Sequence, residues 1–123
     1  MKGLTSHVLD TLHGVPAVGV RLELWLCQTE SGNSEAQLLS EEHSDQDGRC
    51  KLADELEIAS YEIRFHIGEY FKKSQTKLPE PAFLDVVSVR FSVADGSRHY
   101  HIPLVASPWS YTTYKGGAPA DQH

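Results

Sequence analysis

Basic residues are scarce in this sequence. Its 11 lysines and arginines face 17 aspartates and glutamates, which leaves a formal charge of -6 over 123 residues. A nucleic-acid partner needs a basic face that neutralises phosphates, and no basic cluster offsets the acidic balance here. We therefore expect no nucleic acid among the partners of this protein.

Long apolar runs are also missing. No stretch approaches the roughly 20 residues that a membrane-spanning helix needs. The opening residues, MKGLTSHVLD, lack the continuous apolar core of a secretory signal. We expect a cytoplasmic protein that does not associate with membranes.

Cysteine is rare. The two cysteines, Cys27 and Cys50, are too few for a disulfide scaffold. Cys27 lies in an apolar strand pattern, and Cys50 follows directly after Gly48 and Arg49. We predict that both are reduced thiols without a catalytic role, and no other nucleophile stands out.

What the sequence does have is a period of two. Apolar and polar residues alternate over residues 18–27, 59–67 and 87–94, a pattern typical of strands with one buried face. One short helix is expected over residues 69–77, because two prolines follow it. About eight short strands with a single helix predict an all-β fold, a two-sheet antiparallel β-sandwich in one domain.

The strand expected over residues 98–106 has an unusual second face. Alternation gives this strand one apolar face and one mixed face. The apolar face holds Tyr100, Ile102 and Leu104, and the mixed face holds His99, His101 and Pro103. Because the mixed face is neither a plain core nor a plain exterior, we expect oligomerisation to cover it.

Histidine is abundant, and His7, His99 and His101 each lie in or beside an apolar strand. A strand histidine is more often structural than functional, so the residues alone leave that interpretation open. A second alternative is a zinc or other divalent metal site, because His-x-His on a strand puts two imidazoles on one face. The third, which we favour, is that the trio handles protons and substrate without a metal or other cofactor.

Three blocks of the sequence resemble the transthyretin-related 5-hydroxyisourate hydrolases. They are "LTSHVLDTLHGVPAVGVRLEL" at 4–24, "DQDGR" at 45–49 and "HYHIPLVASPWSYTTYKGG" at 99–117. Transthyretin itself, a hormone carrier of the same fold, is similar to the first and last blocks. It lacks the two histidines and the arginine that distinguish the hydrolases, which this sequence has as His7, Arg49 and His101.

The resemblance implies a transthyretin-like sandwich of eight strands with one short helix, assembled as a homotetramer with its sites in a channel between dimers. It implies that His7, Arg49 and His101 are catalytic and that the motif from Tyr114 to Gly117 contributes to substrate binding. We assign His99 to substrate binding with Tyr114 and Gly117. The implied reaction is hydrolysis of the cyclic amide of 5-hydroxyisourate to 2-oxo-4-hydroxy-4-carboxy-5-ureidoimidazoline, in urate catabolism.

The chemistry suits these residue types independently of the resemblance. Water is a poor nucleophile at neutral pH, and histidine is the side chain whose pKa suits a general base there. A guanidinium can grip a small carbonyl-rich heterocycle through paired hydrogen bonds. The alternative function is a transthyretin-like small-molecule carrier, which predicts an apolar channel in place of a histidine-lined one.

The chain departs from the family pattern at its end. Relatives usually end in Tyr-Arg-Gly-Ser, whereas this chain reads Tyr114-Lys115-Gly116-Gly117 and then continues. Lys115 keeps the charge of the arginine but not its planar fork. We interpret residues 1–117 as the hydrolase domain and residues 118–123 as a short C-terminal extension.

Overall fold

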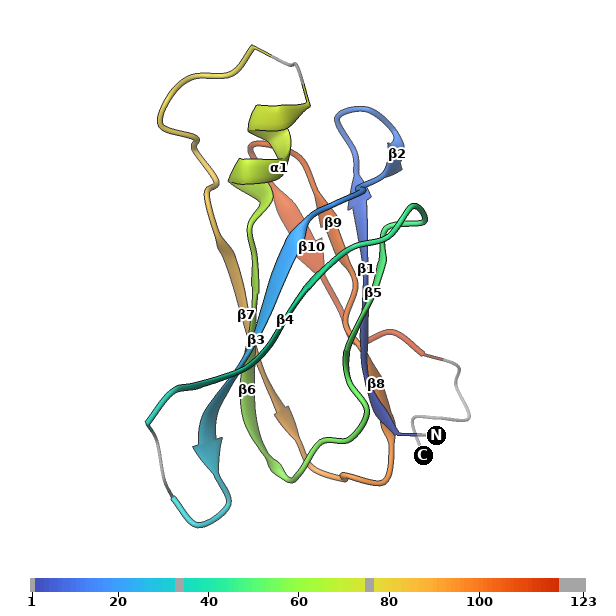
Figure 1. Ribbon diagram of the computed structural model, residues 1–123, viewed down its shortest axis with the longest axis vertical. Coiled ribbons are helices and arrows are strands. Elements are labelled where there is room, and N and C mark those ends of the chain that lie inside the picture. The colour runs from blue at the N-terminus through green and yellow to red at the C-terminus, as the bar shows by residue number, and fades with distance from the viewer. Residues whose placement is uncertain (1, 33–34, 75–76, 118–123) are drawn as a thin grey trace.

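Two β-sheets pack face to face, and a helix covers one end of the sandwich (Figure 1). The computed structural model in Figure 1 describes residues 2–32, 35–74 and 77–117. Within these residues there are ten short strands and one helix. The prediction of an all-β, two-sheet sandwich is therefore confirmed, with ten strands in place of about eight.

The first sheet is organised around the N-terminal strand β1 (Gly3–Asp10). Its other members are β2 (Val15–Pro16), β5 (Arg49–Ala53), β8 (His99–His101), β9 (Leu104–Ala106) and β10 (Tyr111–Thr113). β1 pairs antiparallel with β2 and β5 but parallel with β8 and β9, and β10 pairs antiparallel with β9. This sheet is mixed, because the chain returns from β7 through residues 94–98 and places β8 and β9 alongside β1 in the same direction.

The second sheet is antiparallel throughout. Its strands are β4 (Gln37–His43), β3 (Arg21–Thr29), β6 (Ala59–Phe65) and β7 (Val87–Val93), in that spatial order. The segments expected at 18–27, 59–67 and 87–94 are β3, β6 and β7. β3 begins only at Arg21, because Gly19 forms a turn with a φ of 78° that residues with a side chain rarely adopt.

The core lies between the two sheets, where the inward residues of facing strands meet. Leu4, Leu24, Ile63, Phe65 and Leu104 are fully buried there. Burying a side chain of this size contributes about 1.5–3 kcal/mol. A slip of one residue in β1 would expose its whole apolar set, so the core fixes which β1 residues point outward.

The helix α1 (Ile67–Lys73) starts two residues earlier than the sequence predicted and ends at Lys73. The phenol of Tyr70 on α1 donates a hydrogen bond of 2.7 Å to the buried carboxylate of Asp10, which ties the helix to the end of β1. No helix in the described part of the chain is long and apolar enough to cross a membrane.

The segment expected to be one strand over residues 98–106 is two strands. β8 ends at His101, β9 begins at Leu104, and the break falls at Ile102 and Pro103. Proline has no backbone N–H to continue the pairing with β1. Pro103 is also buried, so its placement on the histidine face was wrong, whereas His99 and His101 do share one face.

Candidate active site

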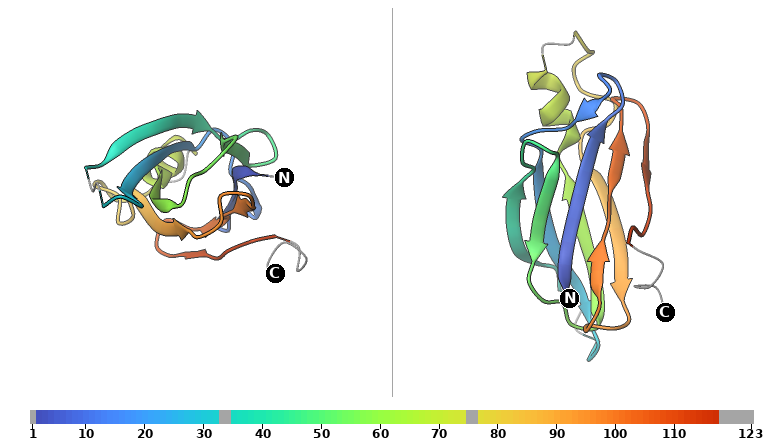
Figure 2. Two further views of the ribbon diagram at one scale, coloured as in Figure 1. Left: turned by 90° about the horizontal axis from the view of Figure 1, so that it is seen from below. Right: turned by 90° about the vertical axis from the view of Figure 1, so that its right-hand side faces the viewer.

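The candidate site is on the outward face of the first sheet, which faces the viewer in the right-hand view of Figure 2. In β1, Leu4, Ser6 and Val8 are buried, and the residues between them, Thr5 and His7, are only partly buried. Because side chains alternate along a strand, Thr5 and His7 point away from the core on the same face.

The neighbours of β1 bring the other predicted residues to this face. His7 pairs with Arg49 of β5 on one side, and Thr5 pairs with His101 of β8 on the other. His7, Arg49, His99 and His101 are thus brought together by strand register, although they come from three separate parts of the chain.

The β4–β5 turn orients His7 and Arg49. The Asp45 carboxylate accepts hydrogen bonds of 2.9 Å from the backbone N–H groups of Arg49 and Asp47. These two hydrogen bonds hold the pKa of Asp45 below its usual value, and the bond from Arg49 has the larger effect. Gly48 has a φ of 77°, and a Cβ atom on it would lie 2.5 Å from the carbonyl of Val8, so only glycine fits.

The turn also fixes the tautomer of His7. Its Nε2 lies 2.9 Å from the main-chain carbonyl of Asp47. A carbonyl oxygen can only accept, so Nε2 carries the hydrogen and donates it. In the neutral imidazole, Nδ1 of His7 therefore holds the lone pair.

Thr5 connects the two histidines of β8. Its hydroxyl oxygen lies 2.7 Å from Nδ1 of His101 and 3.0 Å from Nε2 of His99. Nδ1 of His99 lies 3.3 Å from the main-chain carbonyl of Lys2. Both imidazoles, which belong to β8, are therefore also held in place by hydrogen bonds to Thr5 of β1.

The environment of His101 opposes its protonation. Burial of the imidazole lowers the pKa of His101 below its usual value of 6.5. Electrostatic interactions with His99, His7 and Arg49 lower the pKa of His101 further. A neutral imidazole at pH 7 can accept a proton, which is what a general base must do.

Two residues that contact His101 were missed from the sequence. The N–H of Gly116 donates a bond of 2.7 Å to the carbonyl of His101, and the two residues form an isolated β-bridge. Thr5 was the other omission, although its position two residues before His7 on the same strand placed it on the same face. Nothing in the sequence marks Gly116 beyond its place in the terminal motif.

Tyr114 lies largely on the surface of the described chain and makes no hydrogen bond to a histidine within it. Tyr114 is 57% exposed. It lines a separate cavity of about 210 Å³ with Phe91, Tyr100 and Ile102 among others. Gly117 is exposed and follows Gly116 directly, and residues 118–123 lie outside the described residues. The roles of Tyr114 and Gly117 in substrate binding remain predictions.

No group of three or more histidine, cysteine, aspartate or glutamate side chains in the described ranges is arranged to hold a metal ion. Cys50 is next to Arg49 in sequence, but its side chain is buried. Burial raises the pKa of this thiol to about 12, and the nearby Glu42 and Asp45 carboxylates add to the shift. The thiol is therefore protonated at neutral pH, as the interpretation of a structural cysteine requires.

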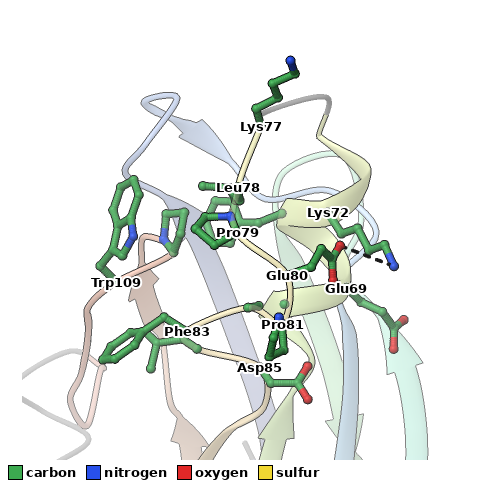
Figure 3. A pocket seen from close by; sticks show the side chains of 15 residues that line it. Glu69, Lys72, Lys77, Leu78, Pro79, Glu80, Pro81, Phe83, Asp85 and Trp109 are labelled. Atoms are coloured by element: carbon green, nitrogen blue, oxygen red, sulfur yellow. Dashed lines mark ion pairs between the residues drawn. The ribbon is translucent and has the colours of Figure 1, made fainter.

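A larger cavity, of about 850 Å³, lies beside α1, at the end of the sandwich that the helix covers. Figure 3 shows its lining beside α1, with Leu78, Phe83 and Trp109 among the side chains and an ion pair of 3.6 Å between Lys72 and Glu80. No histidine lines this cavity. Its described lining includes the carboxylates of Glu69, Glu80 and Asp85 but none of the residues predicted for the site, so its size alone does not make it the reaction site.

Known proteins are similar to this chain over nearly its whole length. The sequence profile of the HIUase/Transthyretin family matches residues 4–116. A 5-hydroxyisourate hydrolase of Ralstonia nicotianae is 42% identical over 120 residues, which cover 94% of this chain and 99% of that protein.

Solved structures share the fold. An (S)-allantoin synthase superposes with a TM-score of 0.82 at 37% identity, and the match covers 94% of this chain but 43% of that longer chain. A sea bream transthyretin in complex with thyroxine superposes with a TM-score of 0.80 at 27% identity, over 94% of this chain and 96% of that one. With the family profile matching nearly its whole length, this chain belongs to the HIUase/Transthyretin family.

Proposed function

We propose that this protein hydrolyses 5-hydroxyisourate to 2-oxo-4-hydroxy-4-carboxy-5-ureidoimidazoline. The observation that carries the proposal is the gathering of His7, Arg49 and His101 on one outward face by the register of β1 with β5 and β8. The similarity to 5-hydroxyisourate hydrolases over nearly the whole chain supports the choice of substrate.

In the proposed reaction, His101 is the general base. Its Nδ1 is engaged with Thr5, so Nε2 is the atom left to accept a proton from water. The water oxygen attacks the carbonyl carbon of the cyclic amide, the C–N bond breaks, and the proton passes from the imidazole to the leaving nitrogen.

Arg49 is the substrate-binding cation of this proposal. Its guanidinium is exposed on the same face and offers a fork of N–H donors to the carbonyl oxygens of the substrate. A fixed positive group also stabilises the negative charge that builds on oxygen during the attack. His7, with its lone pair on Nδ1, accepts a hydrogen bond from a substrate N–H or from the attacking water.

The alternative function, a carrier of an apolar small molecule, fits this face poorly. A sea bream transthyretin with the same fold was solved in complex with thyroxine. In this chain, the outward positions that meet across β1, β5 and β8 are histidine, arginine and threonine. An apolar ligand would cover the Arg49 guanidinium and Nε2 of His101 without giving either a hydrogen-bond partner, at a cost of about 1–3 kcal/mol for each buried group.

We also propose a homotetramer in a reducing, cytoplasmic compartment. The family resemblance implies the tetramer, and three aromatic residues of the C-terminal segment support it. Trp109, Tyr111 and Tyr114 are 55%, 45% and 57% exposed. Contacts through residues 98–106 and 107–114 would bury them. Light scattering that gives a monomer mass at micromolar concentration, with activity retained, would refute the assembly.

One assay tests the function. The ultraviolet absorbance of freshly generated 5-hydroxyisourate is followed with and without the folded protein, and we expect a faster decay with it. His101→Ala serves as the inactive control. Dialysis against a chelator should leave the rate unchanged, since the proposed mechanism uses no metal. A decay equal to the spontaneous rate would contradict the proposed function.

A further inference from the structure

We propose that Thr5 is a proton switch between His101 and His99: its hydroxyl sets the tautomer of His101 and passes the proton that His101 gains on to His99. This inference rests on the proposed function for its catalytic consequence. Its geometry stands on the three hydrogen bonds that join Lys2, His99, Thr5 and His101.

The direction of each hydrogen bond follows from counting hydrogens, starting at the carbonyl of Lys2. That oxygen can only accept, so Nδ1 of His99 carries a hydrogen and donates it over 3.3 Å. In a neutral imidazole the other nitrogen, Nε2, then has a lone pair and no hydrogen. The partner of Nε2 is the Thr5 hydroxyl at 3.0 Å, so the hydroxyl must donate.

A threonine hydroxyl has one hydrogen to give. Because Thr5 donates it to His99, the contact of 2.7 Å with His101 can only be one in which Thr5 accepts. Nδ1 of His101 therefore carries the hydrogen, and Nε2 of His101 holds the lone pair. The carbonyl of Lys2 thus fixes, through His99 and Thr5, which nitrogen of His101 acts as the base.

The same bonds can carry a proton in one step. When Nε2 of His101 takes a proton from water, Nδ1 passes its own hydrogen to the Thr5 oxygen, and the Thr5 hydrogen moves to Nε2 of His99. The products are hydroxide bound to the substrate carbon, neutral His101, neutral Thr5 and protonated His99. Running the transfers backwards returns the proton through His101 to the leaving nitrogen, so atoms and charges balance.

The surroundings of His101 make this transfer useful. The charged or titratable groups packed near it are His99 on its own strand, His7 on β1 and Arg49 on β5. Lys51 of β5 pairs with Thr5 of β1, and its ammonium forms an ion pair with Asp54. Burial does most to disfavour a charged His101, and the groups that act on it are all cationic or able to become so, which adds to the effect of burial. Moving the charge to His99 places it beside the Lys2 carbonyl, which already accepts from that ring.

Thr5 is therefore a positioning residue, and three variants test its role. Thr5→Val removes the hydroxyl while keeping the shape and the strand preference. Thr5→Ser keeps the hydroxyl. Thr11→Val is the matched control, because it removes a hydroxyl in the turn directly after β1, which donates to the carbonyl of Ala106 at 3.0 Å.

The first measurement needs no substrate. Nitrogen-15 chemical shifts of the full-length protein tell which ring nitrogen of His101 carries the hydrogen. We expect hydrogen on Nδ1 in the unmodified protein and in Thr5→Ser and Thr11→Val, and a mixture of tautomers in Thr5→Val. Hydrogen on Nε2 of His101 in the unmodified protein would overturn the proposal, whatever reaction the protein catalyses.

The second measurement is the pH titration of His101 in the same spectra. The positively charged ring donates a stronger hydrogen bond to Thr5 than the neutral ring does, so losing Thr5 should lower the pKa of His101 further. If Thr5 instead donated to His101, its loss would raise that pKa, because the bond would have favoured the neutral ring. The sign of the shift thus separates the two hydrogen-bond directions.

The third measurement is the rate of hydrolysis. Removing the hydrogen-bond partner that orients a metal-binding histidine costs about 10- to 100-fold, and we expect kcat of Thr5→Val to fall by a similar amount. Thr5→Ser should recover most of the rate, and Thr11→Val should match the unmodified protein. A Thr5→Val variant with unchanged kcat would overturn the switch. If no variant hydrolyses 5-hydroxyisourate, the proposed function fails, while the spectra still decide on the hydrogen-bond order.

Discussion

A Cβ atom on Gly116 would lie 2.7 Å from Cδ2 of His101, the ring carbon bonded to Nε2. Carbon atoms in contact normally lie about 3.5–4.0 Å apart, so any side chain at residue 116 must displace the imidazole. The close approach comes from the backbone bond between the two residues, which is 2.7 Å long.

Gly116→Ala should therefore reduce activity by turning His101 out of place. A misplacement of about 1 Å in a catalytic group can cost on the order of 100-fold in rate, so we expect kcat to fall by about 10- to 100-fold. The melting temperature should change little, since Gly116 is near the end of the described chain and outside the core. An alanine variant with unchanged kcat and the same His101 ring position would contradict this.

His101 and Arg49 should respond differently to substitution. Loss of a general base typically costs about 10² to 10⁴-fold, so His101→Ala should lose mainly turnover. Arg49→Lys should lose affinity and turnover together, because an ammonium cannot offer two parallel hydrogen bonds. Steady-state kinetics of both variants in the decay assay check the assignment. Near-normal rates in both would rule it out.

The pH profile should follow His101. Burial and neighbouring cations lower its pKa below 6.5, so the base form is already dominant at pH 7. We expect kcat/KM to stay level above pH 7 and to fall as the pH drops through the His101 pKa, below 6.5. An acid limb with its midpoint above 7, after correction for spontaneous decay, would assign the base to another group.

The same shift predicts a pH dependence of stability. The unfolded chain takes up a proton at His101 near pH 6.5, before the folded protein does, so the folded state loses stability as the pH falls below that value. His101→Gln removes the titrating group and should flatten this part of the stability curve. Urea unfolding at a series of pH values from 7.5 to about 5.5 measures it.

The sequence alone indicated which residue types could carry the proposed chemistry. It did not indicate the contacts that bring those residues together. His99 and His101 could be placed on one face from the strand period alone. That His7 meets Arg49, and that Thr5 meets His101, depends on the register of β1 with two strands from distant parts of the chain. No local pattern states such a register.

The omission of Thr5 has a plain physical reason. Threonine is a common strand residue, so its presence in β1 carries no signal of its own. Its role comes from the parallel pairing of β1 with β8, and the alternation of residues predicted only antiparallel strands. Pro103 was misplaced for a related reason, because alternation stops where proline breaks the strand.

Tyr70 and Asp10 should contribute to stability at the helix end of the sandwich. Burial alone would raise the pKa of Asp10, but hydrogen bonds from Tyr70 and His13 outweigh it and hold that pKa below 3.8. Tyr70→Phe removes a bond to a charged, buried carboxylate, which should cost about 1.5–3 kcal/mol. Tyr61→Phe is the control, because the Tyr61 phenol bonds only neutral groups: it donates to the carbonyl of Glu57 and accepts from the Glu57 N–H, so its loss should cost about 0.5–1.5 kcal/mol for each bond.

Denaturant unfolding of both variants at pH 7 gives the comparison. The contribution of Asp10 is present above its unfolded pKa of 3.8 and is lost as the pH falls through the lower folded value, so the Tyr70→Phe deficit should shrink in strong acid. The Tyr61→Phe deficit involves no charged group and should not change in the same way, so a Tyr70→Phe deficit that stays constant in strong acid would show that the carboxylate at Asp10 gives no added stability.

The terminal motif should be secondary to the histidines. Gly117 stands where relatives have a terminal serine, and it has a φ of 127°, which a serine adopts only with strain. The missing hydroxyl can be replaced by an ordered water at modest energetic cost. Gly117→Ser, with the chain ended at that residue, should therefore change the rate by no more than about tenfold, or roughly 1.4 kcal/mol of barrier.

Ending the chain at Gly117 without the substitution is the matched control, since it separates the effect of the hydroxyl from that of removing residues 118–123. Both variants are compared with His101→Ala in the same decay assay, where His101→Ala should be far more damaging because it removes the base itself. A gain of several orders of magnitude from the serine would mean that the hydroxyl takes part in the chemistry. The mechanism would then need a second proton-handling group at the end of the chain, next to Gly116 and within reach of Nε2 of His101.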